Sequence, residues 1–159
     1  MGPFLLSKGP SNWYYPQKVA MDEKAFVWSF IKKHSLAVLA TTDGQGNPEA
    51  AVLAFAATEA FEFIFNTSNT TRKYQNLLTN PRVAIVIGWD DGQTVQCEGE
   101  ARELKGEEEA KYKDIFYAKN PGSRIHEQMP DERHFAITPR WLRYSDINQE
   151  PPTMIELTF

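Results

Sequence analysis

The sequence predicts a mainly β fold with flanking helices (α+β), in which antiparallel strands form a closed or nearly closed barrel. Two observations lead to this prediction. At least five strand-like apolar runs follow one another along the chain, and only a few helix-like segments are set outside them. The chain of 159 residues has the length of one domain and can bury a single core without disulfides.

An arm of about 20 residues is expected to precede a single domain that spans residues 21–159. The arm is punctuated by prolines, and Trp13, Tyr14 and Tyr15 are expected to pack on the domain or on a partner subunit. Its apolar patch is too short for the core of a signal peptide, and no apolar run in the chain reaches about 18 residues. The sequence therefore predicts neither export nor membrane insertion.

The domain is expected to open with an amphipathic helix over residues 21–34. Phe26 and Phe30 lie four positions apart, as do Val27 and Ile31, so their side chains share one face of a helix. Acidic residues stand in the first turn and basic residues in the last, which matches the helix dipole.

A β-hairpin and a third strand are expected next. Residues 35–42 and 49–57 are apolar runs of small and branched side chains, joined by the Gly-rich turn 43–48. Residues 59–66 then alternate Phe with other side chains, which predicts a strand with one strongly aromatic face.

The second half of the domain is expected to continue the sheet and to add helices. The predicted elements are a short helix that opens at Arg72, strands at 81–89 and 94–104 with a bulge or bend at Gly99, a helix at 105–120, a short helical piece at 122–129, a strand at 134–148 interrupted at Pro139, and an edge strand or arm at 153–159.

The composition argues against several classes of function. With 17 basic and 21 acidic residues the net charge is −4, which leaves no broad basic surface for nucleic acid or for a membrane. Cys97 is the only cysteine, so an internal disulfide framework and a multi-cysteine metal site are excluded. Its place in a predicted buried strand argues against a nucleophile. These features favour a cytoplasmic protein.

No metal site is expected. His34, His126 and His134 are widely spaced, and no cysteine or acidic cluster stands at ligand spacing beside them.

The stretch NTSNTTRK, residues 66–73, carries the chemistry that a phosphate monoester needs. Hydroxyl-bearing residues lead into the first turn of a helix, where backbone N–H groups point outward, and Arg72 and Lys73 add a forked donor and a point charge. Cations are mildly disfavoured at this end of a helix unless an anion binds there. The alternative is an ordinary N-cap followed by two solvated cations.

The residues around this motif resemble the pyridoxamine 5′-phosphate oxidase-like family of FMN-binding split barrels. The resemblance runs from about Val27 to Tyr144. It is carried by LAVLATTDGQGNPEAAVLAF, FEFIFNTSNTTRK, NLLTNPRVAIVIGW and VQCEGEARELKGEE, which are specific in combination. The fold that it implies is an antiparallel split β-barrel that forms a homodimer, with FMN bound at the subunit interface.

The resemblance also implies which residues bind the cofactor. The strand at 51–56 is expected to run along the flavin, Arg72 and Lys73 to hold the phosphate, and one of Thr94 and Gln96 to reach the flavin across the dimer. The expected cofactor-binding residues are Ala51, Val52, Leu53, Ala54, Asn66, Thr67, Thr71, Arg72, Lys73, Thr94 and Gln96. No catalytic side chain is identified.

The sequence departs from the true oxidases of this family at two places. Ala51 and Ala56 stand where those oxidases have Arg and Lys, and the stretch after Ile137 has no His with which to form their Arg-x-His substrate motif. We therefore expect a related FMN-dependent oxidoreductase that transfers hydride or electrons between FMN and a small substrate or nicotinamide donor. A non-catalytic FMN- or haem-binding storage or sensor protein and a deazaflavin-dependent reductase are the alternatives.

Overall fold

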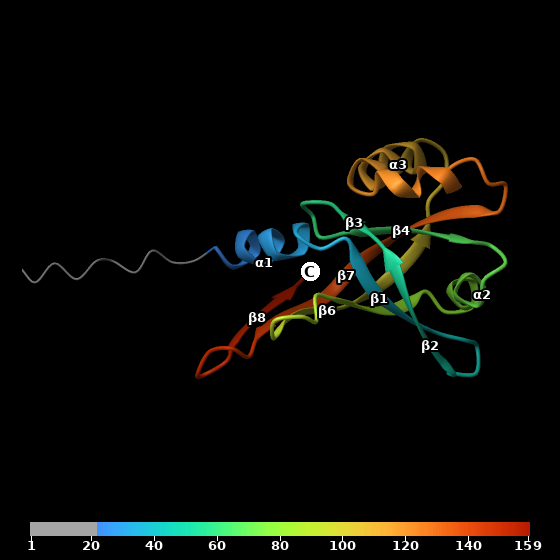
Figure 1. Ribbon diagram of the computed structural model, residues 1–159. Helices are drawn as coiled ribbons and strands as arrows, with labels where there is room; N and C mark the ends of the chain where they lie inside the picture. The colour runs from blue at the N-terminus through green and yellow to red at the C-terminus, as the bar shows by residue number, and fades with distance from the viewer. Residues whose placement is uncertain (1–21) are drawn as a thin grey trace, which may run out of the picture.

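The computed structural model describes residues 22–159, which form an eight-stranded antiparallel sheet with helices at its margins (Figure 1). The strands are β1 (Leu36–Thr42), β2 (Pro48–Ala54), β3 (Ala56–Ala57), β4 (Phe63–Ser68), β5 (Arg82–Ile87), β6 (Gln93–Glu103), β7 (Glu132–Asp146) and β8 (Thr153–Thr158). The helices are α1 (Glu23–Lys32), α2 (Arg72–Thr79), α3 (Gly106–Lys119) and the short 3₁₀ helix η1 (Pro121–His126). The expected arm of residues 1–20 lies outside the described residues.

The strand order is β2-β1-β5-β6-β7-β4-β3, and β8 pairs with the second half of β7. Figure 1 shows the strands curling into a half-barrel, with α1 at one end, α2 at the other and α3 packed across β3 and β4. This architecture confirms the predicted mainly antiparallel α+β fold. It also confirms the expectation of an edge strand near the C-terminus, because residues 153–158 extend the sheet along β7.

The predicted single strand over residues 49–57 is wrong, because the chain bends at Phe55 and forms two strands. The backbone N–H of Phe55 donates to the Ser35 carbonyl at 3.1 Å, and the Phe55 side chain is fully buried. Before the bend β2 pairs with β1, and after it β3 pairs with β4. The run of small apolar residues gives no local sign of this change of partner.

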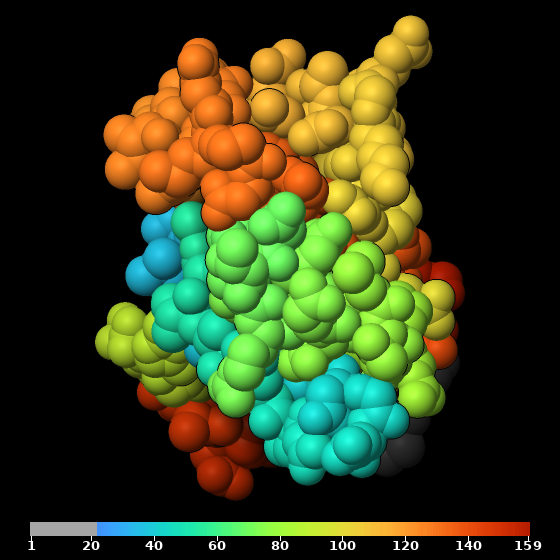
Figure 2. Space-filling model, turned by 90° about the vertical axis from the view of Figure 1, so that its right-hand side faces the viewer, coloured from blue at the N-terminus to red at the C-terminus, as the bar shows by residue number. Residues whose placement is uncertain are grey.

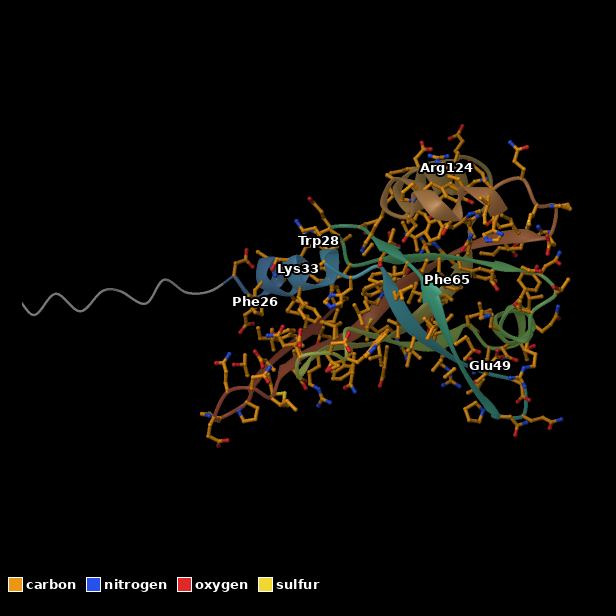
Figure 3. The ribbon with its side chains drawn as sticks, in the orientation of Figure 1. Phe26, Trp28, Lys33, Glu49, Phe65 and Arg124 are labelled. Carbon is orange, nitrogen blue, oxygen red and sulfur yellow. The ribbon has the colours of Figure 1, made fainter. Side chains whose placement is uncertain are left out.

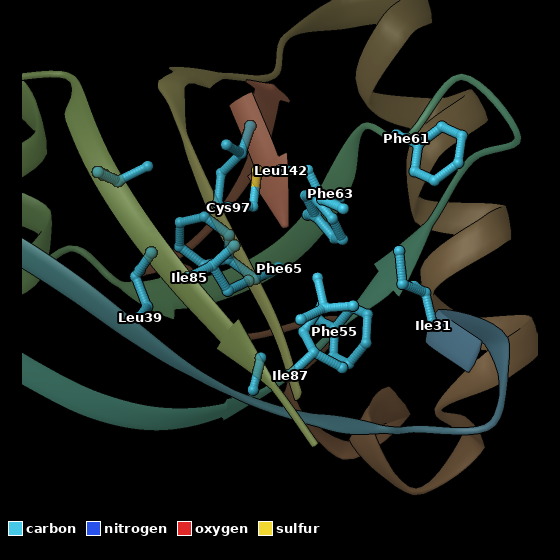
Figure 4. Packing of buried hydrophobic residues seen from close by; sticks show 14 of the residues in the cluster. Ile31, Leu39, Phe55, Phe61, Phe63, Phe65, Ile85, Ile87, Cys97 and Leu142 are labelled. Atoms are coloured by element: carbon cyan, nitrogen blue, oxygen red, sulfur yellow. The ribbon is translucent and has the colours of Figure 1, made fainter. Parts of the chain in front are cut away.

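The third strand also differs from its prediction. It begins at Phe63, because Phe61 occupies the turn before it with a positive φ of 65°. Phe63 and Phe65 point into the barrel core seen in Figure 4, but Ile64 on the opposite face is buried as well. Since α3 covers that face, both faces of β4 are buried. The prediction identified the aromatic face but missed the burial of the opposite one.

Gly99 lies at the predicted irregularity in β6. The register with β7 shifts between Glu98 and Gly99, so that Glu98 pairs with Trp141 and Gly99 with Pro139. A Cβ atom on Gly99 would lie 2.4 Å from the Thr138 carbonyl oxygen, so only glycine fits this close approach. The predicted interruption at Pro139 is wrong: β7 continues through it, with Pro139 opposite Gly99 at the bulge, a position at which a strand tolerates proline.

The helices begin and end close to their predicted bounds. α1 is capped by Asp22, whose Oδ1 accepts a hydrogen bond from the Ala25 backbone at 3.1 Å, and it buries Val27, Phe30 and Ile31. No helix among residues 22–159 has both the length and the apolar character needed to cross a bilayer.

Candidate functional site

The loop that joins β4 to α2 builds the N-terminus of that helix. The Thr71 Oγ1 atom accepts a hydrogen bond from the Tyr74 backbone N–H at 3.4 Å and so caps the helix. Within residues 22–159 the backbone N–H groups of Arg72 and Lys73 have no acceptor. Two N–H groups without partners and two cationic side chains therefore gather at one helix end, which favours an anion.

A cavity of about 240 Å³ lies beside this helix end. It is bordered by the β1–β2 turn and the first turn of α2, and its charged lining residues are Asp43, Glu49 and Arg72. Figure 2 shows this face, with α2 in green above the β1–β2 turn in cyan. The hydrogen bond from the Asn47 amide lowers the pKa of Asp43, so this carboxylate stays ionised at neutral pH.

Glu49 supplies the carboxylate nearest to Arg72 in this cavity. Its Oε2 atom lies 3.7 Å from Arg72 Nε and accepts a hydrogen bond from Asn76 Nδ2 at 3.1 Å. The Glu49 side chain is 15 % exposed, whereas the Arg72 side chain is 84 % exposed. Figure 3 shows Glu49 on the hairpin arm that passes below α2. Arg72 is thus free to turn toward a stronger anion, because its side chain lies largely in solvent and stands 3.7 Å, beyond hydrogen-bond distance, from one carboxylate oxygen.

The side-chain hydroxyl groups of the loop between β4 and α2 form hydrogen bonds with one another. The Thr67 and Thr71 Oγ1 atoms lie 3.0 Å apart, and Ser68 Oγ lies 2.7 Å from Thr70 Oγ1. Ser68 also donates to the Asp131 carboxylate at 2.5 Å, a contact that lowers the pKa of Asp131. The loop is therefore held in place before any ligand binds, and its tie to the start of β7 is a feature that sequence reasoning missed.

The sequence-predicted site residues on β2 and β4 divide between the two faces of their strands. On β2, Ala51 and Leu53 share the inner face with Glu49, while Val52 is 62 % exposed on the outer face. On β4, Thr67 is buried beside Thr71, whereas the Asn66 side chain points to the face covered by α3. Within one chain, Thr67, Thr71 and Arg72 therefore lie close together. The other predicted residues on β2 and β4 could contact a ligand only through the side chains of one strand face or through backbone atoms.

Thr94 and Gln96 lie apart from that group. They stand on the outer face of β6, and β1 and β5 separate β6 from β2 in the sheet. Gln96 is exposed, and its Oε1 accepts a hydrogen bond from Arg143 Nη2 at 2.8 Å. Within one chain these two residues do not join the helix-end cavity.

The outer face of β2, β1 and β5 is apolar and has no covering element among the described residues. The register places Val52, Val38 and Val86 in one row across the three strands. The adjacent row consists of Ala50, Ala40 and Ala84. The valine row ends at Gln96 on β6, so this outer apolar face runs directly to one of the predicted site residues.

A buried polar cluster under α3 was also missed. Tyr117 donates from its hydroxyl to Glu132 Oε2 at 3.0 Å, and the same hydroxyl lies 3.2 Å from His134 Nε2. The side chains of Glu132 and His134 are only 6 % and 2 % exposed. His134 pairs with Asn66 across β4 and β7, so the cluster adjoins a predicted site residue. The sequence offered one signal, His134 at the start of a predicted strand.

Acidification is expected to destabilise the fold through His134. Burial lowers the pKa of His134 below its ordinary value of 6.5. Between the lowered pKa of the folded protein and 6.5, the unfolded chain binds more protons than the folded chain. The free energy of unfolding is therefore at its full value above pH 6.5 and falls as the pH decreases from 6.5 to the lowered pKa. Urea denaturation at a series of pH values should show this loss in wild type and a weaker loss in His134→Gln.

His126→Gln is the matched control, because the His126 side chain is exposed. It should retain the pH dependence of the wild-type protein. An unchanged pH dependence in His134→Gln would assign the acid sensitivity to other groups.

The sequence argued against a nucleophilic cysteine and against a metal site. Cys97 is buried, as the sequence indicated, and burial raises the pKa of its thiol to about 12, so the reactive thiolate is suppressed. Among residues 22–159 no three His, Cys, Asp or Glu side chains are placed to share a metal ion.

Comparison with known proteins places the chain among relatives of one enzyme family. The family model described as pyridoxamine 5′-phosphate oxidase matches residues 24–146. The chain is 36 % identical over 88 residues to the pyridoxine/pyridoxamine 5′-phosphate oxidase of Bordetella avium and 34 % identical over 88 residues to that of Bordetella petrii. Each match covers 55 % of this chain but only 40 % of the relative.

Solved structures share the fold at low sequence identity. A heme binding protein from Mycobacterium smegmatis superposes with a TM-score of 0.76 at 17 % identity, covering 88 % of this chain and 59 % of that one. General Stress Protein 26 from Bacillus anthracis gives 0.69 at 20 % identity, covering 86 % and 100 %. The heme storage protein HutZ from Vibrio cholerae gives 0.62 at 20 % identity, covering 76 % and 92 %.

Proposed function

Because the chain belongs to the pyridoxamine 5′-phosphate oxidase family, we propose that it binds FMN with the phosphate at the N-terminus of α2. The observation that carries the proposal is the helix end itself: Arg72 lines the 240 Å³ cavity, Lys73 follows it in the first turn of α2, and the backbone N–H groups of both residues have no partner among residues 22–159. A phosphate at this place would reverse the unfavourable effect of two cations on the helix dipole.

The donor set of this helix end fits a phosphate monoester. Arg72 offers a planar fork of donors and Lys73 a mobile ammonium group, and neither side chain is committed to a buried partner. The nearest carboxylate, Glu49, is held by Asn76 and lies 3.7 Å from Arg72. A dianionic phosphate outcompetes a single carboxylate at 3.7 Å for this largely exposed guanidinium, so Glu49 does not close the site.

We further propose that the outer apolar face packs against a second copy of the chain. Val38, Val52 and Val86 leave an apolar row on the surface, and such a continuous row is typical of an interface. A two-fold contact through this face would bring Thr94 and Gln96 of one subunit toward the site of the other. The homodimer therefore explains how residues that lie apart in one chain could serve a single ligand.

The proposed activity is an oxidoreductase reaction with a small substrate or a nicotinamide donor. Bound FMN supplies the hydride and electron transfer, while the protein binds the phosphate, orients the ring and excludes water. Residues Ala51–Ala54 and Asn66 would line the ligand, Thr67 and Thr71 would hold the loop, and Arg72 with Lys73 would anchor the charge. No side chain is assigned as an acid or base.

Storage or sensing of haem is the second candidate. Two structures with this fold carry the names heme binding protein and heme storage protein, and haem propionates are anions that Arg72 and Lys73 could also bind. The shared fold supports this candidate less than family membership supports FMN, since the identities are 17 % and 20 %.

An absorption spectrum of the purified protein, before and after reconstitution, separates these candidates. Bands near about 375 and 450 nm, followed by release of FMN on denaturation, would support the flavin. A Soret band would support haem, and a deazaflavin mass would support the third cofactor class. Oxidation of NADH or NADPH that depends on FMN would support an enzyme, while tight binding without turnover over a broad substrate panel would support storage or sensing.

A further inference from the structure

A continuous chain of polar contacts connects the buried side of α3 with Asn66. Asn66 Nδ2 donates to Glu132 Oε1 at 2.5 Å, and Tyr117 donates to Glu132 Oε2 at 3.0 Å. His134 Nε2 lies 3.2 Å from the same Tyr117 hydroxyl. Every group between Asn66 and His134 is therefore joined to its neighbour at hydrogen-bond distance.

The Glu132 carboxylate fixes the orientation of the Asn66 amide. An ionised carboxylate can only accept hydrogen bonds, so the Asn66 side chain must turn its NH₂ group toward Glu132. The Asn66 Oδ1 atom is then directed away, and within the described part of the chain it accepts no hydrogen bond. Asn66 and Glu132 both line a cavity of about 230 Å³, so a ligand can reach the Asn66 side chain from it.

The Tyr117 hydroxyl in turn fixes the carboxylate. Glu132 is 6 % exposed and has no Lys or Arg partner among residues 22–159, so its charge depends on hydrogen bonds. The Tyr117 ring is buried against Phe116 and His134, which holds the hydroxyl in place. Without this hydroxyl, one Glu132 oxygen would lose its donor and the carboxylate could rotate.

The other groups around His134 complete the cluster. Glu109 and Lys113 approach from α3, and Glu132 stands on the same strand as His134. His134 Nδ1 lies 3.3 Å from Glu109 Oε1 without the alignment of a hydrogen bond. A neutral imidazole with its proton on Nε2 can donate a hydrogen bond to the Tyr117 hydroxyl, which then donates to Glu132. Both hydrogen bonds then run in the same direction, from His134 to Glu132.

We propose that Tyr117 and His134 are positioning residues that act through Glu132 to present the side-chain Oδ1 atom of Asn66 to the cofactor. This inference rests on the proposed function, since Asn66 is there a cofactor-lining residue. The ligand group that it selects is a hydrogen-bond donor, such as a ring N–H or a hydroxyl of the flavin. Reversal of the Asn66 amide would present a donor in its place and would weaken binding of such a ligand.

The test compares Tyr117→Phe with Tyr112→Phe. Both tyrosines lie on α3 and donate to a glutamate, but the Tyr112 partner is Glu62, which makes no contact with Asn66. We expect Tyr117→Phe to weaken FMN binding roughly fivefold, as the loss of one net hydrogen bond implies. In the unliganded protein, the side-chain amide signal of Asn66 in a ¹⁵N correlation spectrum should shift. Tyr112→Phe should change neither quantity.

The amide signal and the affinity together decide the proposal. Unchanged FMN affinity in Tyr117→Phe, with wild type binding FMN, would overturn it, and so would an unchanged Asn66 signal. If wild type binds no FMN, the proposed function fails, while the amide signal of the unliganded protein still decides whether Tyr117 orients Asn66. Should Tyr117→Phe not fold, Glu132→Gln replaces it, because a carboxamide at this position can accept either orientation of Asn66.

Discussion

The double variant Arg72→Ala, Lys73→Ala is expected to bind FMN at least roughly 100-fold more weakly than the wild-type protein, because each charge-assisted hydrogen bond contributes about 1.5–3 kcal/mol. Both side chains stand at the first turn of α2, and among residues 22–159 Arg72 is the one cationic residue that lines the adjoining cavity. Equilibrium titration of the unliganded protein, followed by flavin fluorescence, measures the change.

Two comparisons make this result specific to the phosphate. Riboflavin has the same ring without the phosphate, so its affinity should change little in the double variant. Lys32→Ala, Lys33→Ala removes the same charge from the end of α1 and should leave FMN affinity near the wild-type value. Equal FMN affinity in the wild-type protein and the Arg72, Lys73 variant would contradict the phosphate assignment.

Much of the fold was predictable because it depends on local patterns. The β1–β2 hairpin is encoded by two apolar runs around a Gly-rich turn, and α1 by side chains four positions apart. The bend at Phe55 was not predictable, since it depends on a hydrogen bond to Ser35 and on the competition between two partner strands. Burial of both faces of β4 likewise depends on where α3 docks.

Only the part of the candidate site that consists of residues close together in the sequence was predictable. Arg72 and Lys73 follow β4 after a short loop, so the motif at residues 66–73 was enough to place them. The contacts of Ser68 with Asp131 and of Asn66 with Glu132 join residues more than sixty positions apart. No local pattern marks such pairs, because either carboxylate could equally have been solvated.

The variant Val52→Lys is expected to convert a dimer into monomers and to remove tight FMN binding with it. Val52 is 62 % exposed in the single chain and stands in the valine row of the outer apolar face. A two-fold contact through this face would bury two ammonium groups and would cost at least about 3 kcal/mol, which corresponds to a dissociation constant roughly 100-fold higher. Sedimentation velocity over a dilution series measures the dissociation constant of the dimer.

Retention of the monomer fold distinguishes this result from simple unfolding. The Val52 side chain contributes little to the core of one chain, so circular dichroism of Val52→Lys should match the wild-type protein. Leu78→Lys is the control, because Leu78 is 58 % exposed on α2, away from the outer apolar face. It should remain dimeric and bind FMN. A monomeric wild-type protein that binds FMN tightly would contradict the interface site, because Thr94 and Gln96 could not then reach the ligand from a partner.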